Sequence, residues 1–357
     1  MKLLLHVGTE KTGSSYLQTS CGQNRQFLQK SGLWFPDAGE YEKQMQQGIV
    51  SPGNGLELGG HIGSDSWANV TTWLAERVNE AKRRECERLL LSYELLFAEL
   101  SADGAVEKLQ SAATAAGIAE IGCLLVIREP IDHVISLYKH RAKSGRAGSI
   151  EQWIEQGYSL PQQIEDFLAQ VDKSSVQLLV RKYEKSSAAL VRMFFTDWLG
   201  ITEPPTRIDS HVNPSLSLSE LAVIRHVVAS RPDHRRAFYS EFLALSREQK
   251  ADESDMEVEM AKGVETHLSR FNEVWQLLDA RLAADGGIEI PRTRYDSVAR
   301  ARRYSFSEAQ IEALHRAHAR SATLRYTAAT LAHRLGIGKL VRATMSRVRS
   351  GLRKLRG

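Results

Sequence analysis

A glycine-bounded loop directly after the first apolar segment constrains the fold of this chain more than any other feature. Residues 3–7 are almost wholly apolar, as in a strand that is buried on both faces. Residues 8–13 form a loop bounded by Gly8 and Gly13, and a helical pattern begins at Ser14. The amides of such a loop and the positive end of the helix dipole together favour an anion. This order of elements predicts an anion-binding turn at the edge of a parallel sheet.

Three further short apolar runs, over residues 89–91, 123–127 and 176–180, alternate with stretches of helical pattern. Such alternation predicts an α/β fold, in which a parallel sheet lies between two layers of helices. We expect helices over residues 14–30, 67–84, 102–116, 131–143, 160–171 and 188–199.

Two parts of the chain depart from this alternation. Residues 39–63 contain seven glycines without a clear period, which predicts a long surface loop. Beyond Pro205 the strand pattern stops, and helical patterns over residues 216–230, 258–284 and 307–335 predict a helical C-terminal extension.

The charge of the chain is unevenly distributed. With 47 basic and 43 acidic residues the formal charge is +4, which is too near neutral to favour a nucleic-acid partner. Residues 334–357 carry eight basic residues and no acidic one, so the remainder carries −4. No apolar run approaches the roughly 20 residues of a membrane span. Three widely spaced cysteines fit a reducing compartment, so we expect a cytoplasmic protein.

The basic C-terminal tail, residues 336–357, has apolar residues at helical spacing with most of its basic residues between them. An apolar stripe beside a cationic face suits an anionic membrane surface. We therefore predict peripheral association with the inner face of the membrane. Docking on the body of the protein and partial disorder of the tail are the alternatives.

The loop and the helix start carry a recognisable motif in Lys11, Thr12, Gly13, Ser14 and Ser15. These residues match K-[ST]-G-[ST]-[ST] at every position and resemble the sulfotransferase family, which binds the 5′-phosphosulfate of 3′-phosphoadenosine 5′-phosphosulfate (PAPS) there. The resemblance implies that these five residues bind PAPS. Nucleotide triphosphatases instead place a lysine directly after the second glycine, where this chain has Ser14. For the motif alone, an ordinary glycine-containing turn is the alternative.

A second motif begins at Arg128, at the end of the third predicted strand. Arg128, Pro130, Asp132 and Ser136 are similar to R-[ND]-P-x-D-x-x-x-S of the same family, with Glu129 at the second position. The resemblance implies that Arg128 and Ser136 hold the 3′-phosphate of PAPS, and an arginine fork suits a terminal phosphate. For this motif alone, an arginine paired with a surface acid is the alternative.

Glu94 is the first acidic residue after the second predicted strand, where the family has its catalytic base. Bacterial and carbohydrate sulfotransferases often use a glutamate there. The resemblance therefore implies that Glu94 removes the proton of the acceptor and that Lys11 stabilises the leaving phosphate. Two alternatives stay open: Glu94 caps the helix that begins at Leu95, or His61 is the base. Ser92 either contacts the donor or ends the strand.

Later segments resemble the family less closely. Arg303 and Tyr304 lie where the family usually closes a loop over the nucleotide, and they are candidates for contacts with it. Tyr183 follows the last predicted strand and is interpreted as structural. His315 and His318 have the spacing of half a metal site, but no third ligand lies nearby in the sequence, so no metal is assigned.

These motifs imply a sheet of the P-loop nucleotide-kinase type and a division of the chain into three parts. Residues 1–205 are expected to form a PAPS-binding core, and residues 206–335 to complete the acceptor pocket within the same domain. Residues 336–357 form the tail. We expect a sulfotransferase that moves a sulfuryl group from PAPS to a hydroxyl of a saccharide or glycolipid. A P-loop small-molecule kinase and a nucleotide-binding adaptor with a degenerate site are the alternatives.

Overall fold

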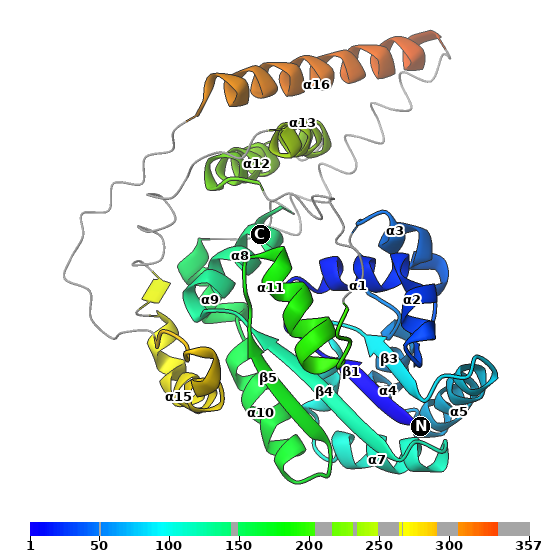
Figure 1. Cartoon of the computed structure of the whole chain (residues 1–357). Helices are drawn as coiled ribbons and strands as arrows, with labels where there is room; N and C mark the ends of the chain where they lie inside the picture. Colours follow the sequence, from blue (N-terminus) through cyan, green and yellow to red (C-terminus); the bar gives the residue numbers. More distant parts are fainter. Residues whose placement is uncertain are drawn as a thin grey trace. The chain divides into compact units, whose positions relative to one another are not determined.

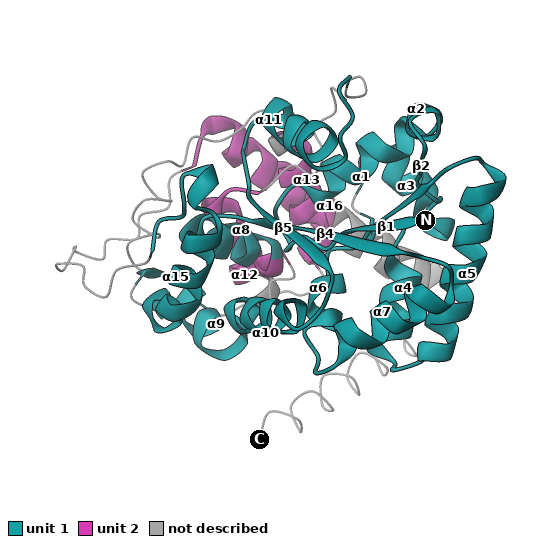
Figure 2. Ribbon diagram, turned by 60° about the horizontal axis from the view of Figure 1, so that its bottom comes forward, with its two compact units in different colours: residues 1–140, 147–214, 254–301 teal, residues 141–146, 215–253, 302–357 magenta. Residues whose placement is uncertain are grey.

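The computed structural model (Figure 1) describes residues 1–49, 51–143, 149–203, 216–230, 234–248, 264–265, 267–290 and 306–334. The chain divides into two compact units (Figure 2). Unit 1 comprises residues 1–140, 147–214 and 254–301, and unit 2 comprises residues 141–146, 215–253 and 302–357. The glycine-bounded loop and the sheet both belong to unit 1.

A five-stranded sheet forms the centre of unit 1. Its strands are β1 (Lys2–His6), β2 (Leu33–Trp34), β3 (Arg88–Ser92), β4 (Glu120–Ile127) and β5 (Gln177–Lys182). Their order across the sheet is β2-β3-β1-β4-β5, and every neighbouring pair is parallel. The predicted parallel α/β architecture is therefore confirmed. The sequence prediction missed β2 because a two-residue strand is too short to show a periodic pattern.

Helices connect these strands along the chain (Figure 1). Before β3 they are α1 (Ser14–Gln23), α2 (Arg25–Lys30), α3 (Glu42–Gln46), α4 (Leu56–Gly63) and α5 (Trp67–Arg83), with a 3-10 turn at Gly39–Tyr41. Between β3 and β5 they are α6 (Leu96–Leu100), α7 (Ala105–Ala115), α8 (Pro130–Ala142), α9 (Ile150–Gly157) and α10 (Leu160–Asp172). After β5 come α11 (Ser187–Val191), a π-helical segment (Arg192–Trp198) and α15 (Asn272–Arg281).

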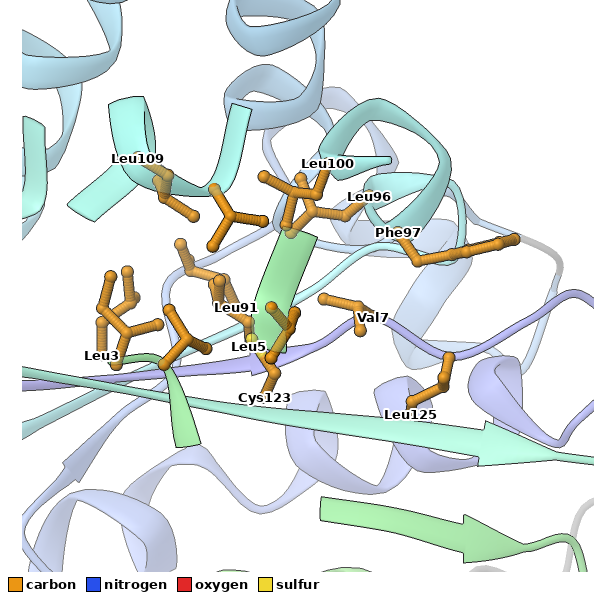
Figure 3. Packing of buried hydrophobic residues seen from close by; sticks show 14 of the residues in the cluster. Leu3, Leu5, Val7, Leu91, Leu96, Phe97, Leu100, Leu109, Cys123 and Leu125 are labelled. Atoms are coloured by element: carbon orange, nitrogen blue, oxygen red, sulfur yellow. The ribbon is translucent and has the colours of Figure 1, made fainter. Parts of the chain in front are cut away.

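Helices cover both faces of the sheet. Alternate residues of a strand point to opposite sides, so the apolar residues of one strand pack against the helices on both faces. On one face, Leu3, Leu5 and Leu91 are fully buried and pack in one cluster with residues of α5, α6, α7 and α10 (Figure 3). On the other face, Leu4 and Leu124 belong to a second cluster with residues of α1, α11 and the π-helical segment. The continuous apolar strand sequences reflect this burial on two sides.

Residues 39–63 are not the surface loop that the sequence predicted. They contain a 3-10 turn, α3 and α4, and Met45, Leu58 and Ile62 are buried core residues. Each glycine in a helix costs about 1 kcal/mol relative to alanine, so the local sequence of α4 disfavours a helix. Leu58 and Ile62 lie on one face of the helix at i,i+4 spacing, and their burial stabilises it against that cost.

The single helix predicted over residues 14–30 is two helices that are separated at Asn24. The Asn24 side chain donates a hydrogen bond to the carbonyl of Ser20 (2.8 Å), and its backbone N–H also binds Ser20 O and Cys21 O (both 3.2 Å). Asparagine competes with the helical backbone for hydrogen bonds and therefore favours a helix end. Helix α1 ends at Gln23, and α2 starts in a new direction at Arg25.

The described residues of unit 2 are mainly helical, as the sequence predicted for residues 216–230 and 307–335. Its described helices are α12 (Leu218–Ser230), α13 (Arg235–Glu248) and α16 (Glu308–Arg334). Gln310 of α16 donates hydrogen bonds to the Ser217 hydroxyl (3.2 Å) and to Glu220 (3.1 Å), which joins the N-termini of α16 and α12. No helix in the described part of the chain has the length and hydropathy to span a lipid bilayer.

Candidate functional site

The three sequence motifs follow three adjacent strands, β3, β1 and β4, at the carboxyl edge of the sheet. The glycine-bounded loop follows β1, Glu94 follows β3, and Arg128 follows β4. The structure brings them together: an Arg128 guanidinium N–H donates to the Lys11 carbonyl (3.2 Å). Burial lowers the pKa of Lys11, with Glu94 opposing and Arg128 reinforcing that shift. In open α/β sheets this edge is where ligands bind.

The backbone of the loop is oriented by side chains that bind three successive carbonyls. The Thr12 hydroxyl donates to Thr9 O (2.6 Å), His133 Nε2 donates to Glu10 O (2.9 Å), and Arg128 binds Lys11 O. In a trans peptide the carbonyl and the following N–H point in opposite directions, and the described residues contain no cis peptide bond. The N–H groups of residues 10–12 therefore point away from these partners, which is the orientation that an anion-binding loop requires.

The imidazole of His133 is neutral in this arrangement. A carbonyl only accepts hydrogen bonds, so Nε2 carries the proton, and Nδ1 accepts from the Tyr158 hydroxyl (3.2 Å). Burial lowers the pKa of His133 to about 4, in agreement with this neutral form. His133 is not among the site residues predicted from the sequence. Its position three residues into a helix that follows a strand-end arginine is the only local signal.

The loop adopts left-handed backbone angles at two positions. Lys11 has φ 66° and Gly13 has φ 84°. A left-handed conformation costs a residue with a side chain about 1–2 kcal/mol, and such strain is concentrated at functional sites. Alternation of this kind forms concave nests of backbone N–H groups that bind anions. Lys11 thus occupies a conformation that its local sequence alone does not favour.

The N-terminus of α1 adds a second indication of a ligand. Helix α1 has ten residues and no side-chain cap, and its first residue, Ser14, is 1 % exposed. The Ser14 hydroxyl lies close enough to Glu94 to affect its pKa. It nevertheless makes no hydrogen bond of good geometry within the described residues. Buried hydroxyls are normally hydrogen-bonded, so this one is available to a ligand at the helix end. Thr12 is also buried, and Ser15 is partly exposed in the first turn.

The pKa of Glu94 lies well above the usual value for a carboxyl. Burial raises its pKa to about 7; Glu10 raises it as well, and Ser14 and Lys11 oppose the rise. The alternative role as a helix cap is not supported, because α6 begins two residues later, at Leu96, and has no side-chain cap. A base whose pKa lies near the working pH combines the ionised state with a strong affinity for a proton.

His61, the alternative base, lies elsewhere in unit 1. It is on α4, where its Nε2 lies 3.9 Å from Glu57 on the same helix face. The groups that shift the pKa values of Glu94 and Lys11 do not include His61. The structure therefore groups Lys11 and Glu94, and leaves His61 outside this group.

Arg128 is held between the loop and β5. Its guanidinium lies 5.3 Å from the ring centre of Tyr183 and 3.7 Å from the Asp132 carboxylate. Its buried Nε has no partner among the described residues. Tyr183, which the sequence indicated to be structural, therefore supports a site residue. Ser136 is partly buried on α8, and no described hydrogen bond joins it to Arg128.

Glu129, which departs from the family pattern, has a structural role. Its carboxylate forms an ion pair with Lys182 and accepts a hydrogen bond from the backbone N–H of Glu289 (2.8 Å). The motif is therefore tied to the chain near residue 289. Arg303, Tyr304 and the tail at residues 336–357 lie outside the described residues.

The stability of the fold should depend on pH through the buried histidines. Burial lowers the pKa of both His6 and His133 to about 4, whereas the unfolded chain titrates near 6.5. The free energy of unfolding should then fall as pH drops from 6.5 towards 4, by up to about 1.4 kcal/mol per pH unit for each imidazole.

Glu94 contributes with the opposite sign. Its folded pKa lies above the unfolded value of 4.5, so its contribution is complete below pH 4.5 and is lost as pH rises to about 7. Urea denaturation between pH 4.5 and 6.5 should give a positive slope of stability against pH, and Glu94→Gln should make it steeper. An unchanged slope in this variant would contradict the raised pKa.

The fold and this site define an α/β protein with an all-parallel sheet and a glycine-bounded loop at its carboxyl edge. The chain matches no protein-family model, no curated protein and no solved structure. In the described part of the chain, no group of three or more His, Cys, Asp or Glu side chains is arranged to hold a metal ion.

Proposed function

We propose that the protein is a sulfotransferase that uses PAPS as donor, on a sheet of the P-loop nucleotide-kinase type. The observation that carries this proposal is the grouping of Lys11, Glu94 and Arg128 at one loop, with the pKa of Glu94 raised to about 7. A cation for a leaving phosphate, a base for an alcohol and an arginine for a second phosphate are the groups that sulfuryl transfer from PAPS requires.

The proposed reaction assigns a role to each group. Glu94 takes the proton of the acceptor hydroxyl, and the acceptor oxygen attacks sulfur. The bond between sulfur and the bridging phosphate oxygen breaks, which gives a sulfate ester and 3′,5′-adenosine bisphosphate. Lys11 and the loop amides stabilise the charge that forms on the 5′-phosphate. Glu94 then releases its proton to solvent.

The remaining site residues position the donor. Thr12, Gly13, Ser14 and Ser15 surround the 5′-phosphosulfate in this proposal. The buried Ser14 hydroxyl, which lies beside Glu94 but makes no hydrogen bond of good geometry, supports it. Arg128 and Ser136 bind the 3′-phosphate, the group by which PAPS differs from ATP. The buried, unpartnered Nε of Arg128 supports a ligand beside it.

The proposed acceptor is a saccharide or glycolipid hydroxyl. The aromatic content of the chain is 7 %, which favours a polar acceptor over a flat phenol. Transfer of ³⁵S-sulfate from labelled PAPS to a panel of glycans, glycolipids and small alcohols identifies the acceptor. No transfer to any member, together with no binding of 3′,5′-adenosine bisphosphate, would reject the proposal.

Ligand binding separates this function from the kinase and adaptor alternatives. A sulfotransferase is stabilised in a thermal-shift assay by 3′,5′-adenosine bisphosphate and not by Mg-ATP. A kinase gives the reverse result, and an adaptor with a degenerate site responds to neither. Position 14, where a P-loop kinase has its lysine, is serine, which favours the first outcome.

Lys11→Ala should weaken the binding of 3′,5′-adenosine bisphosphate about 10- to 100-fold, because a charged hydrogen bond contributes about 1.5–3 kcal/mol. Isothermal titration calorimetry measures this change. Lys30→Ala is the matched control, because Lys30 is exposed at the end of α2. This variant should bind 3′,5′-adenosine bisphosphate with the affinity of the wild type. Equal affinities for Lys11→Ala and Lys30→Ala would remove Lys11 from the donor site.

A further inference from the structure

The outer edge of β3 is completed by a side chain instead of a strand. Strand β2 pairs with β3 only at Arg88 and Leu89. The backbone N–H and carbonyl groups that follow on this side of β3 therefore lie beyond the end of β2. The Asn54 amide occupies this place: its Nδ2 donates to Leu90 O (3.0 Å), and its Oδ1 accepts from the Ser92 N–H (2.7 Å). Asn54 is buried, so these bonds replace strand pairing for backbone groups that burial would otherwise leave unsatisfied.

Every polar group of Ser92, the last residue of β3, has a partner. Its carbonyl accepts from the Gly55 N–H (3.2 Å). Its hydroxyl accepts from Gln18 Nε2 (3.1 Å) and pairs with His6 Nδ1 (2.9 Å). Ser92 stands two residues before Glu94, and the N–H of the intervening Tyr93 binds His6 O (3.2 Å). The backbone that carries Glu94 is thus fixed from both sides.

Glycine is required at position 53, where this segment approaches β3. Gly53 has φ 87°, and a Cβ there would lie 2.2 Å from Ser92 O. A Cβ on Gly55 would lie 3.0 Å from the Cβ of Tyr93. The glycines that suggested a loop in the sequence therefore allow close packing of two backbones.

We propose that residues 53–59, here called the β3 brace, position Glu94, and that Asn54 is the main positioning residue. The brace keeps the end of β3 in the place where Glu94 lies beside Ser14 and Lys11. Asn54 does not touch the reacting atoms in this proposal and acts only through the backbone of β3, at Leu90 and Ser92. The catalytic part of this inference rests on the proposed function, whereas the effect on Glu94 itself does not.

The direct test is the titration of Glu94 in Asn54→Ala, followed by ¹³C NMR of the glutamate carboxyl and assigned with Glu94→Gln. Without the amide, the end of β3 loosens and water reaches the carboxyl. The midpoint should move from near 7 towards 4.5. Asn79→Ala is the matched control, because Asn79 is exposed on α5, and its midpoint should not change.

Gly55→Ala provides a second variant in case Asn54→Ala does not fold. The φ of Gly55 is −96°, so alanine is tolerated by the backbone, while its methyl group presses on Tyr93. The midpoint of Glu94 should move in this variant as well. Midpoints equal to that of the wild type in folded Asn54→Ala and Gly55→Ala would overturn the proposal.

Kinetics test the catalytic part. Asn54→Ala should lower kcat about 10- to 100-fold, because small displacements of a catalytic group have effects of this size. The affinity for 3′,5′-adenosine bisphosphate should stay near that of the wild type. An equal loss in affinity and in kcat would indicate general damage and would overturn the positioning role. If the wild type transfers no sulfuryl group, the proposed function fails, while the NMR titration still tests the brace.

Discussion

Replacing Glu94 with glutamine should reduce sulfuryl transfer about 10²- to 10⁴-fold, because the amide keeps the shape of the side chain but cannot accept the proton of the acceptor. Binding of 3′,5′-adenosine bisphosphate should persist, since Lys11 and Arg128 are unchanged. Label transfer from ³⁵S-PAPS measures the first effect, and calorimetry measures the second.

The pH dependence provides an independent check on Glu94. The carboxyl must be ionised to act as a base, so kcat/KM of the wild type should rise with pH, with a midpoint near 7, and then level off. Glu94→Gln should lose this rise. Glu76→Gln, at an exposed position on α5, is the matched control and should keep both the rate and the pH profile. Full activity in Glu94→Gln would rule out this base.

Gly13→Ala should lower the free energy of unfolding by about 2–5 kcal/mol. The left-handed backbone at φ 84° costs alanine about 1–2 kcal/mol. The new Cβ would also lie 2.6 Å from Leu190, and overpacking of this kind costs about 1–3 kcal/mol more. Denaturation in urea measures the loss. Affinity for 3′,5′-adenosine bisphosphate should fall as well, because the loop must shift to relieve the contact.

Gly104 offers a matched control for this substitution. It also precedes a helix in a left-handed conformation, with φ 70° at the start of α7, but a Cβ at this position would meet no neighbouring heavy atom within 4 Å. Gly104→Ala should therefore show the backbone cost alone, about 1–2 kcal/mol. If Gly13→Ala and Gly104→Ala lower the free energy of unfolding equally, the Leu190 side chain moves away from the new methyl group without an energetic cost.

The grouping of Lys11, Glu94 and Arg128 was predictable from the sequence for a simple reason. Each residue closely follows an apolar run of strand length, and the carboxyl ends of parallel strands meet at one edge of a sheet. The strands β1, β3 and β4 were predictable because burial on both faces gives nearly continuous apolar sequences. Strand β5 lies at the edge of the sheet and is only partly buried, and it was predictable from its apolar run at residues 178–180. No knowledge of distant contacts was needed for either prediction.

The brace, in contrast, was not predictable from local sequence. Glycines at residues 53–59 carry the same local signal in a loop as in a segment packed tightly against a strand. Only the contact of Asn54 with Leu90 and Ser92, 36 and 38 residues away, separates the two cases. His133 is a similar case, since its partner Glu10 lies 123 residues earlier in the chain.

The sequence by itself determined the parallel α/β class, the loop after the first strand and the residues at its mouth, because these follow from periodicity and from local backbone requirements. Only the tertiary structure decided that Lys11 takes a left-handed conformation, that Arg128 and His133 bind the loop carbonyls, and that burial raises the pKa of Glu94 to about 7. The physical reason is that hydrogen-bond partners, close approach and exclusion of water are set by residues far apart in the chain, which a local pattern does not record.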